Sequence, residues 1–156
     1  MKAASLKEIK TELFSLHPKR LLELCLHLAR FRKENKELLS YLLFESGDEK
    51  EYIREVQSQL DELFEEVKKD KPYLAKKTVR KILGIANKYI KYSGSRQTEV
   101  EILIHFCKKL RKSGMPLYAN TSLGNIYLRQ IIKINKSLAT LHEDLQFDYS
   151  EEIRLL

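Results

Sequence analysis

Hydrophobic residues recur at intervals of three and four along nearly the whole chain, with polar residues between them. This is the period of an amphipathic α-helix, and hardly any segment shows the alternation that a half-buried strand requires. The pattern predicts about seven helices, over residues 5–16, 18–32, 36–45, 48–67, 72–92, 97–112 and 121–141. The fold class that we expect is therefore all-α.

Proline and glycine stand where these helices would begin and end. Proline is tolerated in the first turn of a helix, and glycine readily adopts the left-handed conformation that follows the last turn. The prolines are Pro18, Pro72 and Pro116, and the glycines at expected helix ends are Gly47, Gly94 and Gly114. Because the loops are short, consecutive helices are expected to pack as antiparallel hairpins. These hairpins would either close into a compact bundle or stack as a short irregular α-solenoid of the HEAT or armadillo kind.

Two of the expected helices have distinctive hydrophobic patterns. The helix at 97–112 carries one stripe through Val100 and Cys107 and a second through Ile102 and Phe106, which predicts that both of its sides are covered. The last helix carries a single seam, formed by Tyr127, Ile131, Ile134, Leu138, Leu141 and Leu145.

The composition fits one helical domain over residues 1–156, with about the last ten residues forming a loose tail. Of the 156 residues, 43% are hydrophobic and 33% are charged, which suits a folded chain that buries a core of its own. No segment reaches the roughly 18–20 uncharged apolar residues of a membrane span, and the first residues lack the apolar core of a secretory signal. We therefore expect a cytoplasmic protein that does not enter a membrane. Cys25 and Cys107 are expected to be reduced, buried thiols.

Charge is distributed unevenly along the chain. Residues 68–136 hold 17 Lys and Arg against three Asp and Glu, whereas residues 1–67 and 137–156 are net acidic. Helical spacing brings many of these cations onto shared helix faces. Lys77, Lys81, Lys88 and Lys91 form one such stripe, in which Gly84 occupies the position between Lys81 and Lys88 and supplies no side chain. The candidate binding residues are Lys77, Arg80, Lys81, Lys88, Lys91, Arg96, Arg129, Lys133 and Lys136.

A basic face of this kind attracts phosphates or an acidic protein surface. Two other interpretations stay open at this point. The cations form solvated outer faces, or they lie against the acidic helix at 48–67 and the acidic end of the chain. The aromatic residues form no series on which single-stranded bases would stack, and the sequence has no zinc finger. Nucleic acid and an acidic protein therefore both remain candidate partners.

No group of residues has the spacing of a metal or catalytic site. Cys25 and His27 are two residues apart, as are His105 and Cys107, so on a helix the members of each pair point away from each other. The carboxylates of the helix at 48–67 lack the Glu-x-x-His pattern of di-metal bundles and are expected to be solvated. No nucleophile motif occurs either. We expect no metal, no cofactor and no enzymatic activity.

Three features resemble a family of small helical bacterial proteins that is defined only as a domain of unknown function. They are the Leu-rich opening hairpin from Leu6 to Leu43, the helix Ala75–Ile82 and the long closing helix from Leu123. The resemblance covers about residues 6–140, and the final twenty residues depart from it. It implies a cytoplasmic helical fold and brings no catalytic or binding residues.

These patterns favour a non-catalytic binding or adaptor domain that offers its basic face to an acidic protein or to nucleic acid. The alternative is a structural homo-oligomer, in which an apolar seam such as Tyr127–Leu145 pairs with its copy. The two differ in their response to salt, since phosphate binding weakens steeply as salt rises and an apolar dimer persists.

Overall fold

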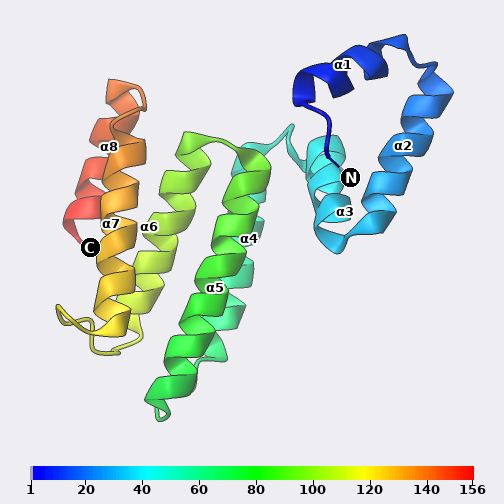
Figure 1. Cartoon of the computed structure of the whole chain (residues 1–156). Helices are drawn as coiled ribbons and strands as arrows, with labels where there is room; N and C mark the ends of the chain where they lie inside the picture. Colours follow the sequence, from blue (N-terminus) through cyan, green and yellow to red (C-terminus); the bar gives the residue numbers. More distant parts are fainter. Residues whose placement is uncertain (1) are drawn as a thin grey trace. The chain divides into compact units, whose positions relative to one another are not determined.

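Helix α6 (Arg96–Lys112) is the central element of the larger of two helical units in the computed structural model, which describes residues 2–156. The helices α4 (Glu49–Glu65), α5 (Pro72–Ser93) and α7 (Ser122–Leu138) all contact α6, as Figure 1 shows. Buried hydrophobic residues lie on several sides of α6: Val100, Ile102, Leu103, Ile104, Phe106, Cys107 and Leu110. The prediction that this helix is covered on both sides is confirmed.

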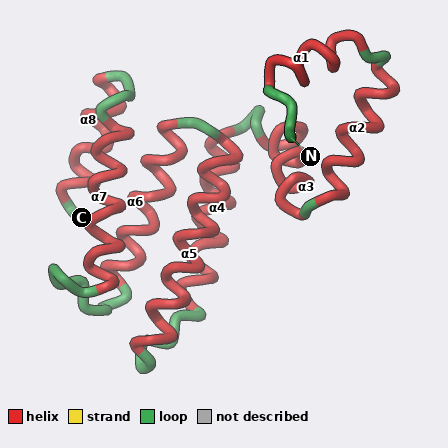
Figure 2. Tube along the Cα trace, in the orientation of Figure 1, coloured by secondary structure: helices red, strands yellow, loops and turns green. Residues whose placement is uncertain are grey.

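Every regular element in residues 2–156 is a helix, so the expected all-α class is confirmed (Figure 2). Neighbouring helices pack in antiparallel contact. The chain divides into two compact units, residues 1–44 and residues 45–156. We call them the N-terminal unit and the C-terminal unit.

The N-terminal unit is built from three helices, α1 (Leu6–Ser15), α2 (Pro18–Phe31) and α3 (Lys33–Ser40). The last of these runs on as a short π-helix, η1 (Tyr41–Glu45). Tyr41 is the only buried residue among the described residues of this unit. The predicted amphipathic helices therefore exist, but their apolar faces are largely uncovered. This is why the prediction of two buried thiols is wrong for Cys25, which is exposed, while Cys107 is buried.

Several helix ends follow the predicted local chemistry. The Asp48 side chain accepts a hydrogen bond from the Glu51 amide and so caps α4. Gly94 ends α5 in the left-handed conformation with φ 68°, as expected of a glycine just past a helix. Short loops join most of these helices, and the hydrophobic seams between them form the core of the C-terminal unit.

The end of the chain differs from the sequence-based expectation. We predicted a helix that continues to at least Leu141, followed by a loose tail, but α7 ends at Leu138 and an eighth helix, α8 (Glu143–Arg154), follows. The His142 imidazole caps α8 by accepting a hydrogen bond from the Asp144 amide at 3.3 Å. Side chains of α6 hold α8 in place, because Lys108 lies 2.5 Å from the carboxylate of Glu152. These contacts between distant residues are invisible to a local pattern.

None of the helices in residues 2–156 combines the length and the apolar composition that crossing a membrane requires.

Candidate binding surface

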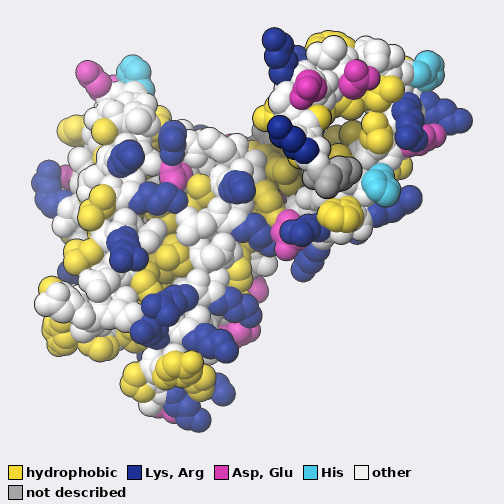
Figure 3. Space-filling view, in the orientation of Figure 1, with side chains coloured by type: hydrophobic (Ala, Val, Ile, Leu, Met, Phe, Trp, Pro, Cys, Tyr) yellow, Lys and Arg dark blue, Asp and Glu magenta, His cyan; other side chains and the backbone are white. Residues whose placement is uncertain are grey.

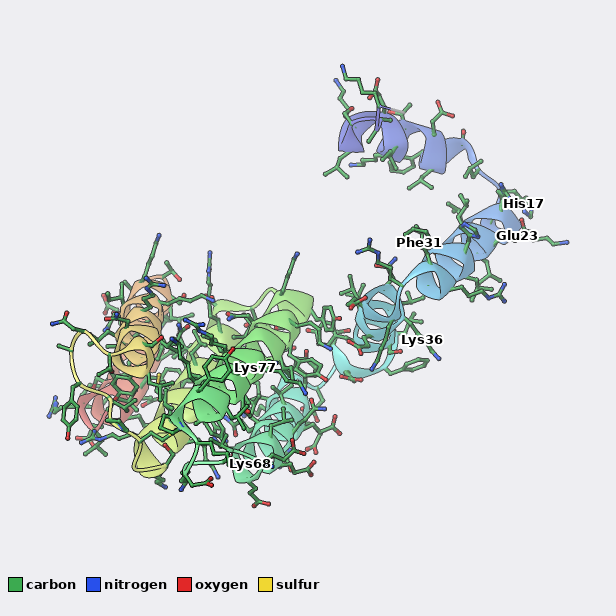
Figure 4. The ribbon with its side chains drawn as sticks, turned by 60° about the horizontal axis from the view of Figure 1, so that its bottom comes forward. His17, Glu23, Phe31, Lys36, Lys68 and Lys77 are labelled. Atoms are coloured by element: carbon green, nitrogen blue, oxygen red, sulfur yellow. The ribbon has the colours of Figure 1, made fainter. Side chains whose placement is uncertain are left out.

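The lysines of α5 lie on the side of the helix that faces away from the core. The buried residues of this helix repeat every three or four positions: Ala75, Val79, Ile82, Ala86 and Ile90. Lys77, Lys81 and Lys91 lie about half a turn away from that stripe, are exposed, and form no ion pair with any described residue. Figure 4 labels Lys77 on α5, and Figure 3 shows Lys and Arg side chains gathered over α5 and α7. These three cations are available to a partner.

Two further candidates on α5 touch neighbouring side chains. The ammonium of Lys88 lies over the rings of Tyr89 and Tyr92, at 4.8 Å and 5.9 Å from their centroids. Such cation–π contacts keep the ammonium group beside the two rings without neutralising its positive charge. The Arg80 guanidinium donates a hydrogen bond to Ser122 Oγ at 3.3 Å, which links α5 to the first turn of α7.

Arg96 and Lys133 form ion pairs with the buried carboxylate of Glu99. The side chain of Glu99 in α6 is 6% exposed, and its oxygens lie 2.9 Å from Arg96 and 2.9 Å from Lys133. Ser137 Oγ donates a third hydrogen bond at 2.5 Å. Lys133 also donates to Asn87 Oδ1 at 2.9 Å, so it joins α5, α6 and α7. The structure therefore places these two predicted binding residues in ion pairs with a buried carboxylate.

This network keeps Glu99 ionised. Burial by itself raises the pKa of Glu99, but the hydrogen bonds from Ser137, Lys133 and Arg96 outweigh it and hold the pKa below its usual range. A buried carboxylate without those donors would be costly, so Lys133 stabilises the packing of α7 against α6, while Arg96 pairs with Glu99 within α6. No sequence pattern reveals this role, because Glu99 and Lys133 lie on different helices.

The remaining candidates on α7 are Arg129 and Lys136. Both are exposed, and neither forms an ion pair with a described residue. Two large hydrophobic side chains, Leu128 and Ile132, are exposed beside them. We define the basic face as Lys77, Lys81, Lys88, Lys91, Arg129 and Lys136.

The position of Gly84 in the lysine stripe of α5 has room for a side chain. Gly84 is exposed, and a Cβ atom added to it would meet nothing within 4 Å. A side chain would fit at this position between Lys81 and Lys88, so the gap reflects the residue type and not crowding.

The interpretation that basic residues lie against acidic ones holds for the end of α6. Asp61 of α4 accepts a hydrogen bond from Lys109 at 2.8 Å and lies 2.5 Å from His105 Nε2. Arg111 donates to the backbone carbonyl of Leu156 at 2.7 Å. Burial tends to raise the pKa of Asp61, but the hydrogen bonds from Lys109 and His105 prevail and lower it. Lys109 and Arg111 of α6 thus join α4 and the chain end to the core.

A polar hollow of about 270 Å³ lies between α4, α6 and α8, lined in part by Glu101, His105 and Tyr149. The Tyr149 hydroxyl donates to the carboxylate of Glu101 and accepts from Gln97 Nε2 at 3.1 Å. Burial and the bond to Glu101 raise the pKa of Tyr149, so its hydroxyl stays protonated. These groups satisfy one another, and within residues 2–156 no three His, Cys, Asp or Glu side chains come together as metal ligands.

The apolar seam that we considered for self-pairing packs within the chain. Ile134 is buried, and Tyr127, Ile131, Leu138 and Leu141 are half-buried. Little of this seam is left for a second copy.

Comparisons with protein-family models, with curated proteins and with solved structures found no match to the chain. Function has to be argued from the surface itself.

Proposed function

We propose that this protein is a non-catalytic, cytoplasmic binding or adaptor domain whose basic face holds an anionic macromolecule. The proposal rests on one observation: some Lys and Arg side chains in the described part of this chain have a carboxylate or carbonyl partner there, and others have none. Arg96, Lys108, Lys109 and Arg111 of α6, together with Lys133 of α7, are paired with carboxylates or backbone carbonyls. Lys77, Lys81 and Lys91 are exposed on one side of one helix and have no such partner among the described residues.

The composition of the α5 part of the basic face, Lys77, Lys81, Lys88 and Lys91, favours nucleic acid over an acidic protein surface. The centres of protein interfaces are depleted in lysine and enriched in aromatic residues, methionine and arginine. The α5 stripe offers lysine, with no large hydrophobic side chain exposed from Ala75 to Ser93. Lysine suits phosphate oxygens as a mobile point charge.

The dimensions of the stripe also fit a phosphate backbone. From Lys77 to Lys91, α5 rises about 21 Å, at about 1.5 Å per residue. A nucleic acid along that length presents several phosphates, which explains how four lysines would act together. Because lysines contact phosphate oxygens and not base edges, binding would be insensitive to base sequence.

The test is fluorescence anisotropy with mixed-sequence DNA and RNA oligonucleotides over a salt series. We expect the wild type to bind at low salt and to weaken steeply as salt rises, because phosphate contacts release counterions. The variant Lys77→Glu/Lys81→Glu/Lys91→Glu should lose binding by at least about a hundredfold, since three attractions become repulsions. Equal binding by wild type and variant would refute the role of the basic face.

A second arm separates the two partner classes. If oligonucleotides fail to bind at low salt, the same proteins are titrated with a labelled polyglutamate peptide. Binding of the peptide by the wild type alone would replace nucleic acid with an acidic protein surface. Failure of both probes would overturn the proposed function.

A further inference from the structure

The N-terminal unit carries a groove between α2 and α3 that combines an apolar floor with a basic rim. It has a volume of about 600 Å³. Its apolar lining includes Leu26, Leu43 and Phe44, of which Phe44 is 81% exposed. Arg30 and Lys36 lie along its edge and form no ion pair with a described residue. Figure 3 shows hydrophobic side chains on the surface of this unit, and Figure 4 labels Lys36 on α3.

A ligand for this α2–α3 groove needs a large hydrophobic side chain surrounded by carboxylates. Exposed apolar surface of this extent is typical of an interaction site, and the basic rim selects for negative charge. An amphipathic helix that lays its exposed residues into a groove between two helices is a recurrent mode of recognition.

The outer face of α8 in this same chain has these properties. Phe147 is 77% exposed, and Glu143 and Glu151 lie four residues to either side of it on the same face of the helix. Asp148 is adjacent. All three acidic residues are exposed and form no ion pair with a described residue. The opposite face of α8 stays engaged with α6, so the outer face is presented on a fixed helix.

The other acidic helix is a poorer match. α4 carries Glu51, Glu55 and Glu62 on its surface, but no large hydrophobic side chain is exposed from Glu45 to Pro72. Charge attraction alone speeds the encounter of two surfaces but adds little affinity. Most binding energy comes from a few side chains that are buried in the interface, and α4 offers no hydrophobic side chain for that role. Only α8 offers the charge and the anchor together.

We propose that the α2–α3 groove of one copy binds the outer face of α8 of a second copy, with Phe147 in the groove and the carboxylates against Arg30 and Lys36. The two surfaces differ, so the contact is head-to-tail: a bound pair still has one free groove and one free α8. Association should therefore increase with concentration. The proposed contact uses no residue of the basic face.

The test is sedimentation velocity of the full chain over a concentration series. We expect the wild type to sediment faster as concentration rises. The groove variant Arg30→Glu/Lys36→Glu and the helix variant Phe147→Ala/Asp148→Lys should each weaken association by at least about tenfold. Mixed together, they should form a complex limited to one copy of each, because the groove variant keeps α8 and the helix variant keeps the groove.

The matched control is Lys77→Glu/Lys81→Glu, which makes the same charge change on the basic face and should self-associate like the wild type. A wild type that stays monomeric at its highest concentration, or two variants that fail to combine, would overturn the proposal. Binding of the groove to anionic vesicles or to an unrelated acidic peptide, without self-association, would also overturn it. Since none of these outcomes involves oligonucleotides, failure here leaves the proposed function to its own test.

Discussion

Lys133 Nζ of α7 lies 2.9 Å from a carboxylate oxygen of Glu99 in α6, and the Glu99 side chain is almost wholly buried. The sequence places Lys133 in one stripe with Arg129 and Lys136, as if all three had the same role. The structure separates them, because Lys133 satisfies a buried charge while Arg129 and Lys136 are exposed. The same residue type thus stabilises the fold at one position and is available for binding three residues later.

Replacing Lys133 with Ala should destabilise the protein, because Glu99 would keep its burial and lose a charged donor. We expect a loss of about 1–3 kcal/mol in the free energy of unfolding, measured by urea denaturation. The matched control is Lys136→Ala, which should change stability by less than about 0.5 kcal/mol. Equal effects of the two substitutions would show that the Glu99 pair contributes nothing.

Acid should destabilise the C-terminal unit through Glu99 and Asp61. The pKa of each carboxyl is lower in the folded chain than its ordinary value, 4.5 for Glu99 and 3.8 for Asp61, so the unfolded chain binds more protons as pH falls. Their contribution is complete above about pH 4.5 and is lost as pH falls through the folded pKa values. Glu45 acts in the opposite sense, since burial and the nearby charge of Glu55 raise its pKa.

The contribution of Glu99 is therefore measured as the difference in unfolding free energy between the wild type and Glu99→Gln. Urea denaturation of wild type and Glu99→Gln from pH 6 to pH 3 (roughly the range that spans the carboxyl pKa values) should give converging stabilities. At pH 6 the variant is less stable than the wild type. Because it lacks the Glu99 carboxylate, its stability falls less as the pH is lowered. Parallel curves would mean that Glu99 does not have a depressed pKa.

Much of the fold follows from local pattern, and the buried network does not. Helix starts at Pro18, Pro72 and Asp48 depend on neighbouring residues only, so they are predictable. The end of α7 and the presence of α8 depend on contacts such as Lys108 with Glu152, which are 44 residues apart. The uncovered apolar faces of the N-terminal unit are equally unpredictable, because amphipathic periodicity shows which side of a helix is apolar and not whether anything covers it.

Filling the gap in the lysine stripe should strengthen binding. Both Gly84→Lys and Gly84→Gln should stabilise α5 by about 0.5–1 kcal/mol, since glycine is unfavourable within a helix and the site is open. Only Gly84→Lys should raise oligonucleotide affinity and steepen the salt slope by about one phosphate contact. An equal gain with Gln would show that helix stability, and not charge, limits binding.

The two cysteines should differ sharply in reactivity. Cys25 is exposed, whereas Cys107 is buried and burial raises the pKa of its thiol to about 12. A thiol-specific reagent should label one cysteine in the native protein and both in denaturant, as read by mass spectrometry. Peptide mapping that finds label on Cys107 of the native protein would contradict the packing of α6.

We propose that the α5 lysines, and not positive charge in general, bind the anionic partner. This proposal is tested most directly by oligonucleotide anisotropy of two charge-matched variants, Lys77→Glu/Lys81→Glu and Arg30→Glu/Lys36→Glu, at one low salt concentration. We expect the first variant to lose at least about tenfold in affinity and the second to bind like the wild type. Equal losses in both variants would contradict the proposal, because binding would then follow net charge and not the basic face.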